Sequence, residues 1–149
     1  MSTGAKKPSK ILNYLYVGDK NHAKSKNLLK ELNITHILNC TPNKNIDPLA
    51  GIPNYFEKEN LFKYKRITIY DNGSDSLISH FETSYQFIEE SKHYGGVLIH
   101  CRQGVSRSVS FTMGYLMKKN QFTAAEALAY IKTFRPVAQP NETFMKQLL

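Results

Sequence analysis

The sequence predicts an α/β fold, in which a central, mostly parallel and twisted sheet is flanked by helices. Two observations predict this class. Short β-rich runs alternate along the chain with stretches whose apolar residues recur at helical spacing. The 149 residues also show no repeat, low-complexity tract or internal boundary, so they fit one domain with its own core. When strands alternate with helices, each helix crosses the sheet before the next strand begins, so the strands pair mainly in parallel.

The amino-terminal third of the chain predicts a strand, a helix and a second strand. Residues 11–17, ILNYLYV, alternate in hydropathy and end at a glycine, which is typical of a strand. Residues 22–32 place three leucines at helical spacing among lysines, which indicates an amphipathic helix. Residues 34–40, ITHILNC, form a β-rich run that stops at a Thr-Pro pair. The Asn, Asp, Pro and Gly residues that follow, up to residue 53, indicate a loop.

The middle of the chain predicts two more strands around a helix. Residues 61–70, LFKYKRITIY, form a strand pattern, and the DNGSDS that follows indicates a turn or loop. Phe81, Tyr85 and Ile88 mark one face of a helix, which a Gly-Gly pair ends. Residues 97–101, VLIHC, then predict a buried strand.

Three helices are expected in the remaining third. Beyond Arg107, apolar residues recur at helical spacing as far as a pair of lysines, where the helix dipole favours cations. Thr123 and Glu126 have the spacing of a capping box, so a helix should run from there to about residue 134, where an Arg-Pro pair stops it. Residues 140–149 predict a last short helix.

The net charge of +8 is concentrated at the start of the chain. The first 30 residues hold seven lysines against Asp19, which gives them +6 and leaves +2 for the rest. Such a segment can bind acidic proteins, anionic lipid or nucleic acid, but a solvated tail and helix face is the favoured interpretation. Without interleaved aromatic residues for base stacking, no nucleic-acid partner is expected. We therefore predict a basic tail over residues 1–10 and a folded domain over residues 11–149.

Neither a membrane anchor nor a metal is expected. No apolar run approaches the ~20 residues that cross a bilayer, and the polar start lacks the apolar centre of a secretion signal, so we expect the cytosol or the nucleus. Cys40 and Cys101 cannot form a disulfide framework, and neither has the paired Cys/His spacing of a zinc site. We predict no cofactor, and the sequence leaves the oligomeric state open.

The stretch VLIHCRQGVSRS, residues 97–108, carries the chemistry. A buried strand that ends in a short loop before a helix turns backbone N–H groups and the positive end of the helix dipole into the loop, which makes an anion site. Cys101 lies within that loop. The same field stabilises a thiolate, so we expect the pKa of Cys101 to lie well below the ~8.5 of a free cysteine. The thiol would then be a nucleophile without a separate base.

Four neighbours of Cys101 have predicted roles. Gly104 allows the positive φ that turns amides inward. Arg107 supplies a planar pair of N–H donors that can bind two phosphate oxygens and stay bound to them as the transition state forms. Ser108 has a hydroxyl that can hydrogen-bond the sulfur when it must leave. His100 is more readily explained as a buried residue that orients the loop than as an acid or base.

Residues 100–108, HCRQGVSRS, resemble the phosphate-binding loop of cysteine-dependent protein tyrosine phosphatases in their dual-specificity form. The resemblance extends from about residue 11 to residue 149, as for a small, atypical, single-domain member with a catalytic domain over 11–149. The family more often has alanine where Gly114 stands, a departure expected to loosen local packing. By resemblance the fold is phosphatase-type, and the phosphate-binding residues are Arg102, Gln103, Gly104, Val105, Ser106 and Arg107.

The resemblance implies a two-step reaction on phosphorylated proteins. Cys101 takes the phosphoryl group as a thiophosphate ester, and water then hydrolyses it. Asp71 matches the family's general acid, about thirty residues before the cysteine; Asp75 in the same loop is the competing candidate, and a turn-forming role is the structural alternative for Asp71. The catalytic set is then Cys101, Arg107, Asp71 and Ser108. Asn141 matches a recurrent Pro-Asn and is expected to hydrogen-bond the catalytic loops.

The substrate is the least determined part of this interpretation. The chain is too short for the extra loop that deepens the pocket of tyrosine-only phosphatases, so phosphotyrosine and phosphoserine or phosphothreonine are all expected. Phosphoinositide or RNA phosphate on the same scaffold is the alternative substrate, and a non-catalytic phosphoprotein-binding module is the alternative function. Cys40 is expected to be a core residue rather than a redox partner of Cys101, although an oxidative disulfide between them remains open.

Overall fold

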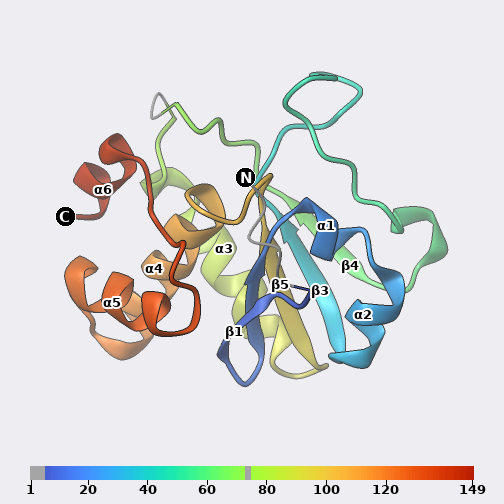
Figure 1. Ribbon diagram of the computed structural model, residues 1–149, viewed down its shortest axis with the longest axis horizontal. Helices are drawn as coiled ribbons and strands as arrows, with labels where there is room; N and C mark the ends of the chain where they lie inside the picture. Colours follow the sequence, from blue (N-terminus) through green and yellow to red (C-terminus); the bar gives the residue numbers. More distant parts are fainter. Residues whose placement is uncertain (1–5, 73–74) are drawn as a thin grey trace.

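The computed structural model describes residues 6–72 and 75–149, so Met1–Ala5 of the predicted tail and two residues of the predicted 71–76 loop lie outside the described part. Its centre is one five-stranded sheet, in the order β1-β2-β5-β3-β4 (Figure 1). Four of the strands run parallel, and only β1 is antiparallel to its neighbour. The fold class expected from the sequence is therefore confirmed. The strand bounds are Ser9–Leu12 (β1), Leu15–Gly18 (β2), Ile34–Asn39 (β3), Lys63–Arg66 (β4) and Gly96–His100 (β5).

Helices cover both faces of the sheet (Figure 1). Side chains along β5 alternate between the two faces: Val97 and Ile99 join the larger core, whereas Leu98 joins the smaller one. The larger core packs against α3, α4, α5 and α6, and the smaller core packs against α1 and α2. The helix bounds are Lys20–Ala23 (α1), Lys26–Glu31 (α2), Ile78–Ser91 (α3), Arg107–Asn120 (α4), Ala124–Phe134 (α5) and Glu142–Leu148 (α6), with a 3-10 turn at Glu57–Glu59.

The first predicted strand is wrong in one respect, because residues 11–17 contain a hairpin. Strand β1 begins at Ser9, inside the segment expected to be a tail, and a two-residue turn at Asn13 and Tyr14 leads into β2. The alternation in hydropathy continues from β1 into β2, so the sequence pattern did not reveal the turn between them.

The predicted helix over residues 22–32 is likewise two helices. Ser25 has an extended backbone, with φ −102° and ψ 91°, and this separates α1 from α2. Serine competes for backbone hydrogen bonds and therefore favours helix ends. The Asp19 carboxylate caps α1 by accepting from the N–H groups of Asn21 and His22.

The predicted strand over residues 61–70 is shorter than expected, because β4 ends at Arg66. Its neighbour β3 also ends, and the Ile67 N–H makes the last bond between them, to Asn39 O (2.9 Å). Beyond Ile67, backbone groups bind side chains instead of a neighbouring strand. Ile69 O accepts from the side chain of Arg107, and the Tyr70 N–H donates to the side chain of Asp75. The segment therefore leaves the sheet after Arg66 and leads to Asp71.

Two expectations in the helical third have clear outcomes. The capping box of Thr123 and Glu126 is confirmed, with both reciprocal bonds present at the start of α5. The expected loosening at Gly114 is wrong: a Cβ there would lie 2.8 Å from the ring of Phe81, which instead packs against the helix and edge-on to Phe111. No helix among the described residues is long and apolar enough to cross a membrane.

Candidate active site

The carboxyl end of β5 opens into a short loop that leads directly into α4. We call residues 101–106 the cysteine loop. Cys101 follows the strand and is 3% exposed. A cavity of about 430 Å³ lies over this loop and brings together three residues that the sequence analysis selected, Cys101, Arg107 and Asp71. The full lining is Asp71, Cys101, Arg102, Gln103, Val105, Ser106, Arg107, Gln139, Pro140, Asn141 and Glu142.

The backbone carbonyls of the cysteine loop are held outward. Those of residues 102–105 each accept a hydrogen bond from a group outside the loop. The bonds are Lys20 N to Arg102 O (3.2 Å), Arg135 Nη2 to Gln103 O (3.2 Å), Arg135 Nε to Gly104 O (2.7 Å) and Gln139 N to Val105 O (2.8 Å). Because these carbonyls are occupied on the outside, the loop can direct its N–H groups inward, where an anion would bind.

Arg135 is the functional residue that sequence reasoning missed. It is 2% exposed, and its guanidinium binds two carbonyls of the cysteine loop and the hydroxyl of Ser9. The sequence marked it only as the end of a helix, because its partners are far away along the chain. Gly104 has φ +68°, and a Cβ there would lie 2.4 Å from Arg135 Nη2 and 2.6 Å from Gly18 O, so this turn requires glycine.

The sulfur of Cys101 lies in a positive environment. The N–H of Gly104 donates to Sγ at 3.3 Å, and Ser108 Oγ lies 3.3 Å from Sγ. Burial raises the pKa of the Cys101 thiol, but the Arg107 guanidinium, the Ser108 hydroxyl and the backbone N–H groups of Ser108 and Gly104 together outweigh it. The pKa therefore lies below its ordinary value, which favours the thiolate.

Arg107 opens α4 and is 7% exposed. Its Nη1 donates to Ile69 O at 2.9 Å, which holds the side chain to the segment that follows β4. Its Nε is buried and has no hydrogen-bond partner among the described residues. A buried N–H without a partner is costly, so a guanidinium held in this way is suited to an anion that completes its bonds.

Asp71 lines the same cavity and is exposed. Its Oδ1 accepts a hydrogen bond from Asn141 Nδ2 at 2.8 Å. Asn141 also donates its backbone N–H to Ser106 Oγ (2.9 Å) and caps α6 by accepting from the N–H of Phe144 (2.8 Å). The expectation that Asn141 hydrogen-bonds the catalytic loops is thus confirmed, and Asn141 joins the cysteine loop to the segment that carries Asp71.

Asp75 does not line this cavity. Its Oδ2 accepts from the N–H of Tyr70 at 2.8 Å, and its backbone carbonyl accepts from Gln147 Nε2 at 2.9 Å. These bonds give Asp75 the turn-forming role, so the geometry favours Asp71 of the two carboxylates as the acid.

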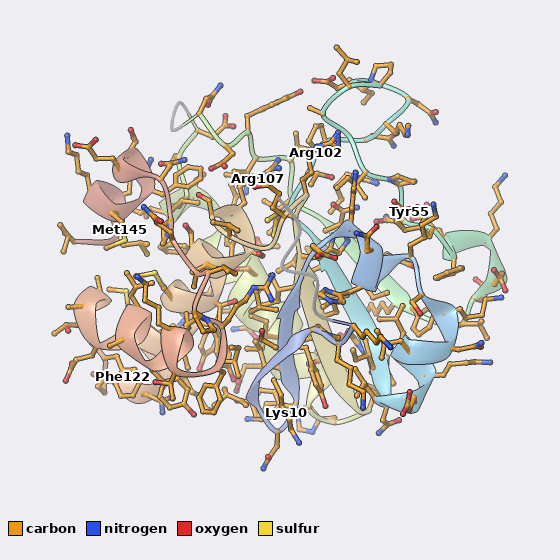
Figure 2. The ribbon with its side chains drawn as sticks, viewed as in Figure 1. Lys10, Tyr55, Arg102, Arg107, Phe122 and Met145 are labelled. Carbon is orange, nitrogen blue, oxygen red and sulfur yellow. The ribbon has the colours of Figure 1, made fainter. Side chains whose placement is uncertain are left out.

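The side chain of Arg102 extends away from Cys101. Although its backbone belongs to the cysteine loop, Nη2 donates to Leu49 O at 3.2 Å, and the side chain is exposed (Figure 2). Gln103 and Val105 also line the cavity, and the hydroxyl oxygen of buried Ser106 accepts a hydrogen bond from the Asn141 N–H. Arg107, at the start of α4, is thus the buried guanidinium near the sulfur, and Arg102 of the cysteine loop is the exposed one.

His100 is fully buried at the end of β5. Its Nδ1 lies 3.4 Å from Cys101 O, and Nε2 has no partner among the described residues. Burial lowers the pKa of His100 to about 4, so the imidazole is neutral at physiological pH. This agrees with the positioning role and does not favour acid–base chemistry.

This burial makes stability depend on pH. Below pH 6.5 an unfolded chain protonates this imidazole, whereas the folded protein resists protonation down to about pH 4. The free energy of unfolding should therefore fall as pH drops through this window, by about 3 kcal/mol in total from His100 alone. Urea titrations at several pH values measure it. The slope between pH 6.5 and 4.5 should be smaller in His100→Asn; an unchanged slope would contradict the assignment.

Cys40 is a fully buried core residue, as expected. It also follows Asn39, whose partner in the parallel pairing of β3 and β5 is His100, the residue before Cys101. The two cysteines therefore leave neighbouring strands in the same register. Burial raises the pKa of the Cys40 thiol, and nearby Cys101 raises it further, so Cys40 stays protonated.

This placement gives the disulfide alternative a test. Hydrogen peroxide would oxidise the Cys101 thiolate to a sulfenic acid with release of hydroxide; attack by the Cys40 thiol would then form the disulfide and release water. If this occurs, peroxide-treated protein should recover most of its activity with dithiothreitol, and Cys40→Ala should recover several-fold less because Cys101 oxidises further. Equal recovery in both proteins would leave Cys40 only its core role.

Comparison with known proteins agrees with this geometry. The family model described as dual specificity phosphatase, catalytic domain, matches residues 15–149. Dual specificity protein phosphatase 1 of Arabidopsis thaliana is 41% identical over 142 residues, which cover 95% of this chain and 67% of that protein. Dual specificity protein phosphatase 1 of Mus musculus is 37% identical over 143 residues, which cover 95% of this chain but only 36% of the mouse protein.

Among solved structures, a human tyrosine phosphatase-like serine/threonine/tyrosine-interacting protein has a TM-score of 0.84 and 30% identity. That match covers 97% of this chain and 94% of the other. The family model spans residues 15–149, and both relatives are more than a third identical to this chain over 95% of its length. The chain therefore belongs to the family of dual specificity phosphatase catalytic domains.

Proposed function

We propose that this domain hydrolyses phosphate monoesters on tyrosine and on serine or threonine residues of proteins, through a cysteinyl-phosphate intermediate. The observation that carries the proposal is the placement of Cys101, Arg107 and Asp71 on one cavity, with the thiol pKa lowered. Family membership and the named relatives support the same activity.

In the first step the Cys101 thiolate attacks phosphorus, and the bond from phosphorus to the substrate oxygen breaks. Arg107 and the inward N–H groups of the cysteine loop hold the equatorial oxygens, whose charge they stabilise. The carboxyl of Asp71 donates its proton to the departing oxygen. The products of this step are the free hydroxyl of the substrate and a thiophosphate ester on Cys101.

In the second step water attacks the phosphorus of that ester. Asp71, now a carboxylate, accepts a proton from the water, and the sulfur leaves as a thiolate. Ser108 Oγ lies 3.3 Å from the sulfur and can donate its hydroxyl hydrogen to the charge that develops there. Inorganic phosphate is released, and the domain returns to its starting state.

Phosphoproteins are the preferred substrates over RNA phosphate in this proposal. None of the residues that line the cavity is aromatic, so a nucleobase finds no ring on which to stack. We propose no nucleic-acid partner and no stable membrane anchor. Two free cysteines, one of which must stay reduced for catalysis, are consistent with the cytosol or the nucleus.

A non-catalytic role as a phosphoprotein-binding module is the second candidate. It is favoured by the likeness to a solved protein whose name calls it phosphatase-like. The groups that turnover requires, Cys101, Arg107 and Asp71, all stand in this chain, and we therefore rank catalysis first. Turnover of p-nitrophenyl phosphate and of a panel of phosphotyrosine, phosphothreonine, phosphoinositide and capped-RNA substrates decides between them; inactivity on all of these would support the binding module.

Replacement of Asp71 tests the general acid. Asp71→Asn should lower kcat for a phosphothreonine peptide by about 10²- to 10⁴-fold, because an alkoxide cannot leave without a proton. The loss should be smaller for p-nitrophenyl phosphate, whose leaving group is a much weaker base, and the rate should no longer depend on a protonated carboxyl. Stopped assays of released phosphate across pH measure both effects.

Asp75→Asn is the matched control, since the amide oxygen of asparagine can still accept from the Tyr70 N–H. It should stay within a few-fold of the parent on both substrates. A larger loss in Asp75→Asn than in Asp71→Asn would reverse the assignment of the acid.

A further inference from the structure

The last helix, α6, is attached to the segment that carries Asp71 by a side chain that the proposed reaction does not use. We call residues 70–72 and 75–77, which lead into α3, the acid segment. The amide of Gln147 makes two hydrogen bonds to it: Nε2 donates to Asp75 O at 2.9 Å, and Oε1 accepts from the Leu77 N–H at 2.7 Å. Figure 1 shows α6 at the left, next to the green stretch that leads into α3.

These two bonds fix the orientation of the Gln147 amide. A backbone carbonyl can only accept and a backbone N–H can only donate, so exchange of the amide oxygen and nitrogen would break both bonds. Leu77 is fully buried, and its N–H would be left without this partner if Gln147 were replaced by an apolar residue. The amide therefore holds the backbone at Asp75 and at Leu77 in one arrangement.

The helix that presents Gln147 is itself anchored near the cysteine loop. Phe144 and Leu148 of α6 are 0% and 4% exposed and belong to the larger core. The helix also packs against α4, into which the cysteine loop leads. Its cap, Asn141, donates its backbone N–H to Ser106 Oγ of that loop at 2.9 Å. A segment that is bound to α6 is therefore held in place relative to the cysteine loop as well.

The bonds of Gln147 extend to Asp71 through Asp75. The carbonyl of Asp75 binds Gln147, and its Oδ2 accepts from the Tyr70 N–H at 2.8 Å. Tyr70 is the residue before Asp71, so the backbone at the acid is connected through Asp75 to Gln147. The carboxyl of Asp71 has a separate bond, from Asn141 Nδ2 at 2.8 Å. An exposed carboxyl is thus attached to α6 and its cap in two ways, once by its side chain and once by its backbone.

We propose that Gln147 is a positioning residue for the general acid, whose amide holds the acid segment where the carboxyl of Asp71 reaches the departing oxygen of the substrate. This inference rests on the proposed function and adds a residue to its machinery. Gln147 does not line the catalytic cavity, so it acts through Asp71 and does not touch the substrate. Proton transfer needs the two heavy atoms within about 2.6–3.2 Å of each other, so a displacement of the acid segment by about 1 Å is enough to slow it.

Gln147→Met removes both bonds and keeps an unbranched side chain of similar length. For a phosphothreonine peptide, kcat should fall by about tenfold, because the alkoxide needs the proton of Asp71. For a series of aryl phosphates, the loss should shrink as the leaving group becomes a weaker base, to less than about twofold for p-nitrophenyl phosphate. Steady-state assays of released phosphate measure this dependence. An equal loss on every substrate would show only a general structural role, and would overturn the inference.

A double-mutant cycle tests whether Gln147 acts through Asp71. In protein that already carries Asp71→Asn, Gln147→Met should change kcat for the phosphothreonine peptide by less than about twofold, whereas independent effects would multiply. A further tenfold loss in the double variant would overturn the inference. Lys146→Met is the matched control, since Lys146 is the exposed neighbour in α6 and pairs with Glu142 at 3.7 Å. It should match the parent on every substrate; a selective loss like that of Gln147→Met would also overturn the assignment to Gln147.

Amide exchange separates this inference from the proposed function, because it needs no turnover. In Gln147→Met the N–H of Tyr70, which Gln147 does not itself bind, should exchange with deuterium about tenfold faster, since Asp75 is no longer held by α6. Unchanged exchange at Tyr70 would overturn the inference. If the parent protein turns over no substrate, the proposed function fails, and this measurement still tests the positioning of the acid segment. Turnover that Gln147→Met lowers equally on all substrates overturns the inference and leaves the proposed function intact.

Discussion

Cys101→Ser is expected to lower the turnover of p-nitrophenyl phosphate on the order of 10⁵-fold while leaving the affinity for inorganic phosphate within a few-fold. The loop that lowers the pKa of the thiol cannot ionise an alkyl hydroxyl to a useful extent at neutral pH, so the nucleophile is lost. The donors that hold the anion remain, because the bonds of Arg135, Gln139 and Lys20 to the loop carbonyls do not involve the sulfur. Steady-state assays and calorimetric titration with phosphate measure the two quantities.

Alkylation of Cys101 is an independent measurement of the lowered pKa of its thiol. The pH dependence of iodoacetamide modification at Cys101 should report a pKa below the ~8.5 of a free cysteine, with Cys40 unreactive in its core position. Full activity in Cys101→Ser, or an ordinary protonated thiol at neutral pH, would contradict the mechanism.

Arg107→Lys is expected to lower kcat by about 10³-fold, although it keeps the positive charge. The guanidinium uses Nη1 to hold Ile69 O and keeps its buried Nε available in the cavity. One ammonium group cannot bind this carbonyl and also present a planar pair of donors to the phosphate. Single-turnover kinetics with p-nitrophenyl phosphate measure the loss in the chemical step itself.

Comparison with Arg107→Ala separates geometry from charge. If the planar fork is what matters, both variants should be impaired to a similar degree. A lysine variant that keeps most of the parent activity while the alanine variant loses it would show that charge alone suffices at this position. Thermal unfolding of both proteins accounts for any loss caused by the buried site itself.

Sequence reasoning reached the features that are local along the chain. The capping box of Thr123 and Glu126 lies within four residues, and the segment from the end of β5 to the first residue of α4 carries the nucleophile, the glycine and the arginine within seven positions. Each of these patterns contains both partners of the interaction that it predicts. For this reason the central fold class and the position of Cys101 followed from the sequence alone.

The features that could not be predicted from the sequence depend on contacts between residues that are far apart along the chain. Arg135 holds carbonyls more than thirty residues away, and nothing beside it in the sequence marks that role. Strand β4 ends at Arg66, where its neighbour β3 also ends, and no pattern within residues 61–70 marks that end. The hairpin turn at Asn13 and Tyr14 lacks the glycine that commonly announces such a turn.

The bonds of Arg135 also bear on the order in which the protein acquires its chemistry. This one side chain contacts Ser9, 126 positions earlier, and the cysteine loop, 31 and 32 positions earlier. Contacts between such distant segments form slowly, because closing long stretches of chain costs entropy before any bond is gained. A chain in which β5 and α4 have formed but the amino-terminal strand and the end of α5 have not docked would therefore lack the bonds that hold the carbonyls of Gln103 and Gly104 outward.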